Sequence, residues 1–163
     1  MDKDANLLEI MGAIQDALNS FGDQTVDIIR QNLASTGTNA SNETSKSLKS
    51  TLVEPNRLQV TGKPYIYVVE TGRKPGKISK KMVSNILKWV ETGKPSFSGD
   101  KVSFAWAITK KIGKEGSALF RAGGRKDIIT PAISEQRINR LTSEIAGISL
   151  DLLFKSIEDG KRR

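Results

Sequence analysis

The chain has 163 residues, with 26 lysines and arginines against 18 acidic residues and a net charge of +8. It contains no cysteine and no histidine, which excludes disulfides, thiolate or histidine-based catalytic triads, and ordinary zinc or haem sites. No apolar run approaches the roughly 20 residues that a bilayer span needs, and the first residues lack the features of a signal peptide. We therefore expect a soluble protein, made in the cytoplasm, with no membrane partner.

The charge is distributed unevenly along the chain. Residues 1–62 carry 5 basic and 8 acidic side chains, and residues 127–163 carry 6 of each. Residues 63–126 carry 15 basic and only 4 acidic side chains, a net charge of +11. Such a segment favours contact with a polyanion or with the acidic face of a partner subunit, and a merely solvated basic face is the alternative.

A long helical region is predicted over residues 4–34. Apolar residues recur there at alternating spacings of four and three, which places them on one helix face: Leu7, Met11, Ile14, Leu18 and Phe21, continued by Val26, Ile29 and Leu33. Gly22 interrupts this pattern. It either kinks one long helix or separates two helices.

Extended segments follow a polar loop over residues 35–47. Strands are predicted over 47–53, 57–61 and 65–69, and the last is aromatic and β-branched. A short final strand is predicted at 128–129. Together these segments indicate a small, largely antiparallel sheet of about four strands.

A helix pair is predicted at about 79–113. Ser79 and Asp100 are suitable N-caps for its two helices, and Gly93 and Gly113 are suitable stops. The pair carries both tryptophans, which we expect in the core. It is predicted to project as an insertion rather than to complete the sheet.

The last helix is predicted over residues 131–158, opened by Pro131 after Thr130. The fold class is thus α+β, a single domain over 1–163 with long N- and C-terminal helices flanking the sheet. The expected core joins two sets of residues across these helices: Leu7, Met11, Ile14 and Leu18 with Ile138, Leu141, Ile145 and Ile148.

Catalytic and cofactor-binding groups are scarce. The segment Gly72–Lys77 resembles a phosphate-binding loop, but it has three residues between its glycines and Ile78 after its lysine. A nuclease built on Glu70 and a lysine would need several convergent carboxylates, and no spacing supplies them. We expect no enzyme activity, no cofactor and no metal.

The candidate contact residues are therefore basic. They would touch a neighbouring subunit, another protein or DNA along its path, without sequence specificity in the last case: Arg73, Lys74, Lys77, Lys110, Lys111, Lys114, Arg121, Arg125 and Lys126.

Several segments together resemble the tail-completion, or head–tail joining, proteins of tailed bacteriophages. The resemblance begins with the tyrosine-rich segment 65–76, which ends in Val-Glu-x-Gly and a basic, proline-containing turn. Further similar segments occur in the expected order: 44–52, 86–90, 105–112 and, around the closing strand, Phe120 and 128–132.

This resemblance implies a structural protein of the virion neck or tail. Such a head–tail connector forms a homo-oligomeric ring of roughly 6 or 12 copies, which joins the portal-bearing head to the tail around the DNA path. Its partners would be itself, other neck, portal or tail proteins, and genomic DNA in the lumen. The alternative is a sequence-independent DNA-binding accessory protein that uses residues 63–126.

Overall fold

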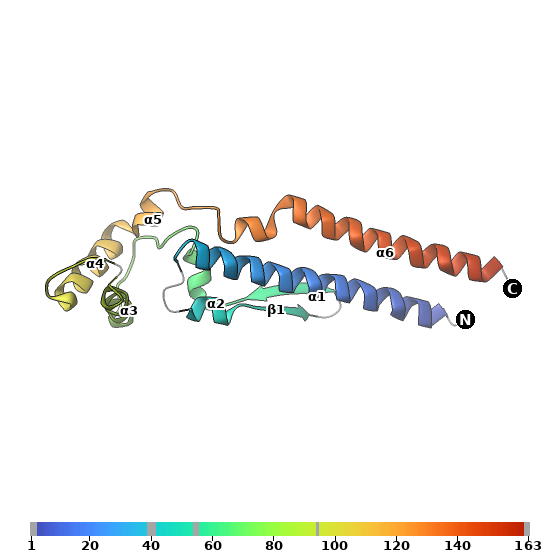
Figure 1. Cartoon of the computed structure of the whole chain (residues 1–163), viewed down its shortest axis with the longest axis horizontal. Coiled ribbons are helices and arrows are strands. Elements are labelled where there is room, and N and C mark those ends of the chain that lie inside the picture. Colours follow the sequence, from blue (N-terminus) through green and yellow to red (C-terminus); the bar gives the residue numbers. More distant parts are fainter. Residues whose placement is uncertain (1–2, 39–41, 54–55, 94, 162–163) are drawn as a thin grey trace. The chain divides into compact units, whose positions relative to one another are not determined.

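A computed structural model describes residues 3–38, 42–53, 56–93 and 95–161 of the chain (Figure 1). The chain forms two compact units. The terminal unit combines Met1–Lys63 with Ile128–Arg163, and the inserted unit is Pro64–Asp127. The fold is mixed α and β, with long helices at both ends of the chain.

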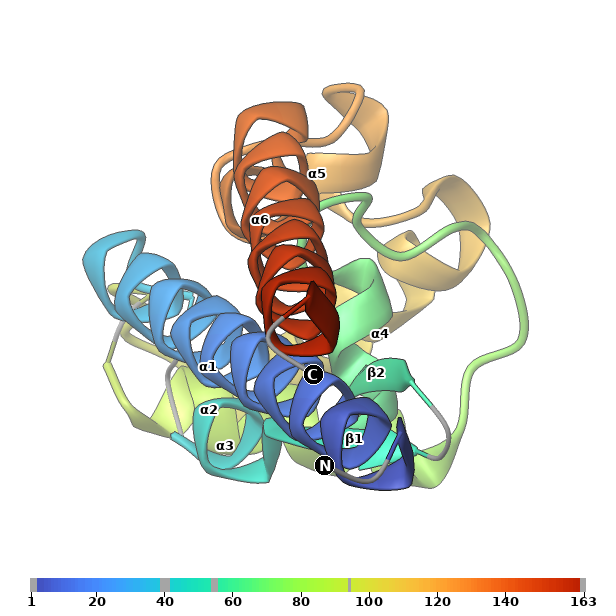
Figure 2. The ribbon, with the colours of Figure 1, turned by 90° about the vertical axis from the view of Figure 1, so that its right-hand side faces the viewer.

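Helix α1 (Lys3–Ser35) is the central element of the terminal unit. Helix α6 (Glu135–Lys161) packs along it, and so does the hairpin formed by β1 (Lys49–Val53) and β2 (Arg57–Thr61). The two helices run antiparallel, so the start of α1 and the end of α6 lie at the same end of the unit (Figures 1 and 2). Near that end, Lys155 of α6 pairs with Glu9 of α1 at 3.6 Å.

Gly22 neither kinks nor divides α1, which is continuous from Lys3 to Ser35. It is buried where the hairpin crosses the helix. A β-carbon at this position would lie 2.7 Å from Leu58 Cδ1 and 2.9 Å from Ser50 Cβ. The glycine therefore permits a close approach of helix and hairpin.

The core of the terminal unit lies mainly along the second half of α1. Asn32 donates its side-chain amide to the carbonyl of Ile128, and Arg30 donates to the carbonyl of Leu48, which holds both returning segments on the helix. The fully or nearly buried apolar residues of this unit are Ala17, Leu18, Val26, Ile29, Leu33, Leu48, Ile128 and Ala132. The predicted core is thus partly wrong, because Leu7 and Ile138 are 56% and 48% exposed.

The described residues form two strands, rather than about four. They pair antiparallel, with Lys49 opposite Thr61 and Val53 opposite Arg57. The predicted strand at 65–69 is instead a 3₁₀ helix, η1 (Pro64–Val68). Proline favours a first helical turn, and the buried side chains of Ile66 and Val69 are three residues apart, which suits a 3₁₀ turn rather than a strand.

The predicted final strand at 128–129 is also wrong. These residues lead into a 3₁₀ helix, η2 (Thr130–Ile133), which has Pro131 in its first turn. Extended backbone at Ser134 then separates η2 from α6, so the last long helix begins at Glu135 rather than at residue 131.

The polar loop contains one short helix, α2 (Glu43–Ser47), and residues 39–41 of the loop lie outside the described residues. The predicted helix pair is present as α3 (Lys80–Glu91) and α4 (Lys101–Glu115). It lies in the inserted unit and contributes nothing to the sheet. Helix α4 passes through Gly113 and ends at Glu115, and it is followed by Gly116, whose φ of 84° suits a glycine.

Candidate functional site

All nine predicted contact residues lie in the inserted unit. This unit has 14 basic and 5 acidic residues, a net charge of +9, whereas the terminal unit has 12 basic and 13 acidic residues. The boundary between the units therefore coincides with a change in the sign of the net charge. This separation of charge by unit is the main electrostatic feature of the chain.

Helices α3 and α4 form the scaffold for much of this charge. Their packed faces bury Val83, Val90 and Ala105, and the buried hydroxyl of Thr109 donates to the carbonyl of Ala105 at 2.7 Å. The expectation that both tryptophans belong to the core is wrong. Trp89 is 37% exposed and Trp106 is 40% exposed.

The first turns of both helices are capped as the sequence predicts. Ser79 Oγ accepts the amide of Met82, and the Asp100 carboxylate accepts the amides of Val102 and Ser103. The hydrogen bond with the Ser103 side chain, followed by those with the two amides, lowers the pKa of Asp100. The carboxylate therefore stays ionised near neutral pH, where it also complements the positive end of α4.

The basic turn Gly72–Lys77 is anchored at two points. Arg73 donates its amide to Ser117 Oγ at 3.0 Å, and its carbonyl accepts the amide of Ser117 at 2.9 Å. Further along, the amide of Gly76 donates to the carbonyl of Gly113 at 2.9 Å, at the end of α4. The turn thus presents its side chains from a fixed backbone, which the sequence pattern alone does not reveal.

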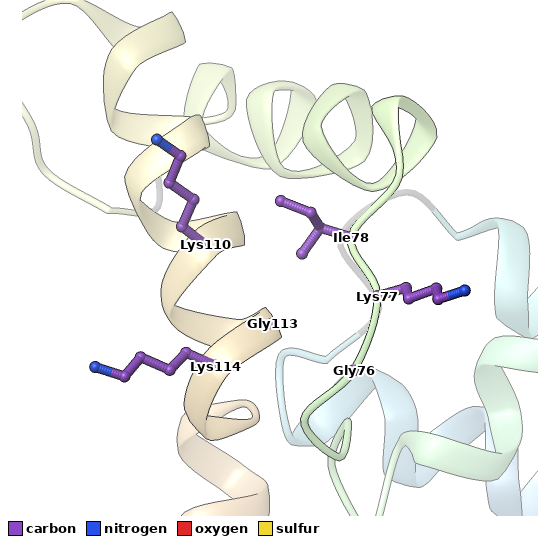
Figure 3. Close-up of a pocket in the computed structure, with 6 residues that line it drawn as sticks. All are labelled: Gly76, Lys77, Ile78, Lys110, Gly113 and Lys114. Atoms are coloured by element: carbon purple, nitrogen blue, oxygen red, sulfur yellow. The ribbon is translucent and has the colours of Figure 1, made fainter.

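A shallow, open depression of about 500 Å³ lies between this turn and α4 (Figure 3). Lys77 comes from the turn, and Lys110 and Lys114 come from successive turns of α4. Figure 3 shows that the Lys77 side chain points in the opposite direction from Lys110 and Lys114. The three ammonium groups do not converge, so this arrangement suits contacts with an extended acidic surface better than capture of one small anion.

Two of the candidate residues are already paired within the inserted unit. Arg121 binds Glu115, and Arg125 makes two parallel hydrogen bonds to Asp127 at 2.5 and 2.6 Å. The hydrogen bond between Arg125 and Asp127 raises the pKa of the guanidinium and lowers the pKa of the carboxyl group. These two arginines therefore shape the unit itself, and their charge is largely compensated.

The remaining candidates are more available. Arg73 donates from Nη2 to the carbonyl of Lys77, so its side chain braces the turn. Six of the nine candidates are exposed lysines that make no ion pair with any described residue: Lys74, Lys77, Lys110, Lys111, Lys114 and Lys126. These six residues are named the lysine set below.

An acidic face on α1 was not included in the sequence prediction, which noted only that the first third of the chain is acidic. Glu9, Asp16, Asp23 and Asp27 are exposed and follow one another at spacings of seven, seven and four residues. This spacing places them on one side of the helix, and it could have been recognised in the sequence. Asp27 pairs with Arg30, and Glu9 pairs with Lys155 at 3.6 Å, so the charge of this acidic face is partly compensated.

The described residues form neither a metal-binding cluster nor a membrane-spanning helix. Over the described ranges, no group of three or more carboxylates is arranged to hold a metal ion. Among the same residues, no helix combines the length and the apolar character needed to cross a bilayer. The chain has no match among protein-family models, curated proteins or solved structures.

Replacing Ser117 with alanine tests whether the basic turn depends on its anchor. The change removes the N-cap of α5 (Ala118–Arg121) and the acceptor of the Arg73 amide. We expect a loss of about 1–2 kcal/mol in stability and faster hydrogen exchange at Arg73 and Phe120. Ser84→Ala, at an exposed position of α3, is the control. Unchanged exchange at both amides would show that the turn is held by other contacts.

Proposed function

We propose that this chain is a structural virion protein of a tailed bacteriophage. It forms a homo-oligomeric ring in the neck or tail, which connects the portal-bearing head to the tail around the DNA path. It is made in the host cytoplasm and resides in the virion. The resemblance of segment 65–76, and of the segments around it, to head–tail joining proteins supports this proposal.

The observation that carries the proposal is the separation of charge between the two units. The lysine set lies on the inserted unit, and the acidic face lies on α1 of the terminal unit. Two different and complementary surfaces on one chain allow head-to-tail contacts, and such contacts close into a ring when the rotation between copies permits it. Individual rim ion pairs are worth little, but many together steer docking and fix its register.

The second candidate function is sequence-independent DNA binding by the inserted unit. The lysine set favours it too, because six exposed cations without an internal partner could neutralise phosphates. The two functions differ in their assembly. A ring needs the acidic face of a neighbour, whereas a DNA-binding accessory protein acts as a monomer or dimer.

The ring proposal is tested by reversing charge on the lysine set. Lys110→Glu with Lys114→Glu should abolish assembly, because these neighbouring side chains would then repel the acidic face. Assembly of the unchanged protein should also weaken between about 0.1 and 1 M salt, as the Debye length falls from about 10 to about 3 Å. Electron microscopy and sedimentation would measure both effects.

A control variant carries the same kind of change elsewhere. Lys49→Glu alters an exposed lysine of β1 in the terminal unit and should leave assembly intact. Rings at low salt that are lost only in the Lys110/Lys114 variant support the proposal. A protein that stays monomeric at every salt concentration and retards duplex DNA in a gel would overturn it in favour of the second function.

A further inference from the structure

Helix α6 has two apolar faces, and only one of them is covered. Leu141, Ile145, Ile148 and Leu152 are half-buried and recur at the spacing of the face that packs on α1. A second set lies on the opposite side of the helix and is exposed by 53%, 54%, 60% and 47%: Leu150, Leu153, Phe154 and Ile157. We name this set the outer face of α6. A helix that is apolar on both sides normally has a partner on each side.

The outer face changes character along its length. Towards the N-terminus of α6 it continues with Ser143, Ala146 and Gly147, which are small. A β-carbon built at Gly147 would meet nothing within 4 Å, so this half is open. The large side chains are all in the C-terminal half. A partner that fits this surface must therefore present small side chains to the C-terminal half of α6 and large side chains to its N-terminal half.

A second copy of α6 in antiparallel orientation meets this requirement. With Leu150 at the centre of the pair, Ile157 lies opposite Ser143 of the other copy, Phe154 opposite Ala146, and Leu153 opposite Gly147. Large and small residues then alternate across the interface, as in well-packed helix pairs. A parallel pair would instead place the large residues against each other and leave the small ones without contacts.

Two of the charges at the edge of the outer face fit the same orientation, although the exposed acids Glu144 and Asp151 lie along this edge as well. Arg140 and Glu158 are both exposed, and among the described residues neither makes an ion pair. They are 18 residues apart, which is about five turns of helix, so they lie along the same edge. In an antiparallel pair the same edges of the two helices face each other, so Arg140 of each copy meets Glu158 of the other.

We propose that the outer face of α6 binds the outer face of a second copy of this chain, in an antiparallel pair centred on Leu150. The contact is isologous, so it does not by itself close a ring. It therefore goes beyond the proposed function and holds whether the assembled protein is a neck ring or a DNA-binding protein. This dimer is expected in the purified protein at low concentration, where contacts through the lysine set have not yet formed.

Cysteine cross-linking tests the orientation, because the natural chain has no cysteine to interfere. Leu150→Cys should form a disulfide-linked dimer on mild oxidation, since the two sulfur atoms would lie close to the two-fold axis. Ser143→Cys is the matched control on the same face. In the antiparallel pair its two copies are about 21 Å apart along the helices, so it should not cross-link.

Charge exchange provides an independent measurement. Sedimentation should give twice the chain mass of 17.8 kDa, and Arg140→Glu or Glu158→Arg alone should weaken the dimer about tenfold. The double exchange should restore it, because each reversed pair matches again. A monomer at all concentrations, efficient cross-linking of Ser143→Cys, or failure of the double exchange to restore the dimer would each overturn the proposal.

Discussion

Gly72→Ala should be among the most damaging single substitutions in the inserted unit, with a loss of about 3–5 kcal/mol. Gly72 is buried and has a φ of 71°, which other residues adopt only with strain. A β-carbon there would also lie 2.3 Å from the backbone nitrogen of Phe120 and 2.7 Å from Ser117 Oγ. Either the turn or the start of α5 must move to relieve this overlap.

The two tryptophans make the measurement specific, because Trp89 and Trp106 both belong to the inserted unit. Their fluorescence during denaturant unfolding therefore reports on this unit alone. Gly123→Ala is the matched control, since Gly123 has a φ of 85° but nothing within 4 Å of a β-carbon. It carries the backbone strain without the overlap and should cost about 1–2 kcal/mol. Equal losses in the two variants would show that packing around Gly72 contributes nothing.

Gly22→Val should have the largest effect of a glycine change in the terminal unit. The valine side chain would overlap Leu58 and Ser50, so the hairpin would have to separate from α1. We expect a loss of about 3 kcal/mol, because a well-packed interior cannot accept the extra volume. Far-UV circular dichroism measures this loss, since α1 and α6 contribute 33 and 27 helical residues.

Gly12→Val is the matched control for this prediction. Gly12 lies on the same helix, and a β-carbon there would meet nothing within 4 Å. Helix propensity slightly favours valine over glycine, so this variant should be neutral or marginally stabilised. The prediction is contradicted if both variants unfold at the same denaturant concentration.

The positions of most helices could be predicted from the sequence, because their apolar periodicity and their caps indicate the same boundaries. The apolar pattern predicts a helical region over residues 4–34, close to the observed bounds of α1. Ser79 and Asp100 cap α3 and α4 as expected. Two of the predicted strands, at 47–53 and 57–61, are also present as β1 and β2. These features depend on neighbours in the sequence, so local patterns contain the necessary information.

Other features depend on residues that are distant in the sequence. From the sequence pattern, Gly22 could either kink a helix or separate two helices. The sequence does not show the actual reason for a glycine at this position, which is the close approach of Leu58 and Ser50. The segment 65–69 has strong β propensity, yet it forms η1 next to Pro64. Propensity is a weak guide where tertiary contacts decide which side chains become buried.

The sequence names the candidate contact residues but does not show how they lie. All nine basic residues lie in the inserted unit, as their clustering in the sequence suggests. The sequence does not distinguish Arg121 and Arg125, which are paired within the unit, from the exposed lysines beside them. An ion pair forms only where the folded backbone brings a carboxylate close to the basic group. It does so for Arg121 with Glu115 and for Arg125 with Asp127.

The division of the chain into two units also sets an order for folding during synthesis. The inserted unit is one continuous segment and can complete its contacts as soon as it leaves the ribosome. The terminal unit cannot, because α1 and the hairpin emerge before the inserted unit, and α6 emerges after it. Helix α6 ends 126 residues after α1 ends, so at synthesis rates of about 5–20 residues per second α1 waits roughly 6–25 s for its complete partner helix. During that time the side of α1 around Phe21 and Thr25, later covered by Arg137, is open to chaperones and to other nascent chains.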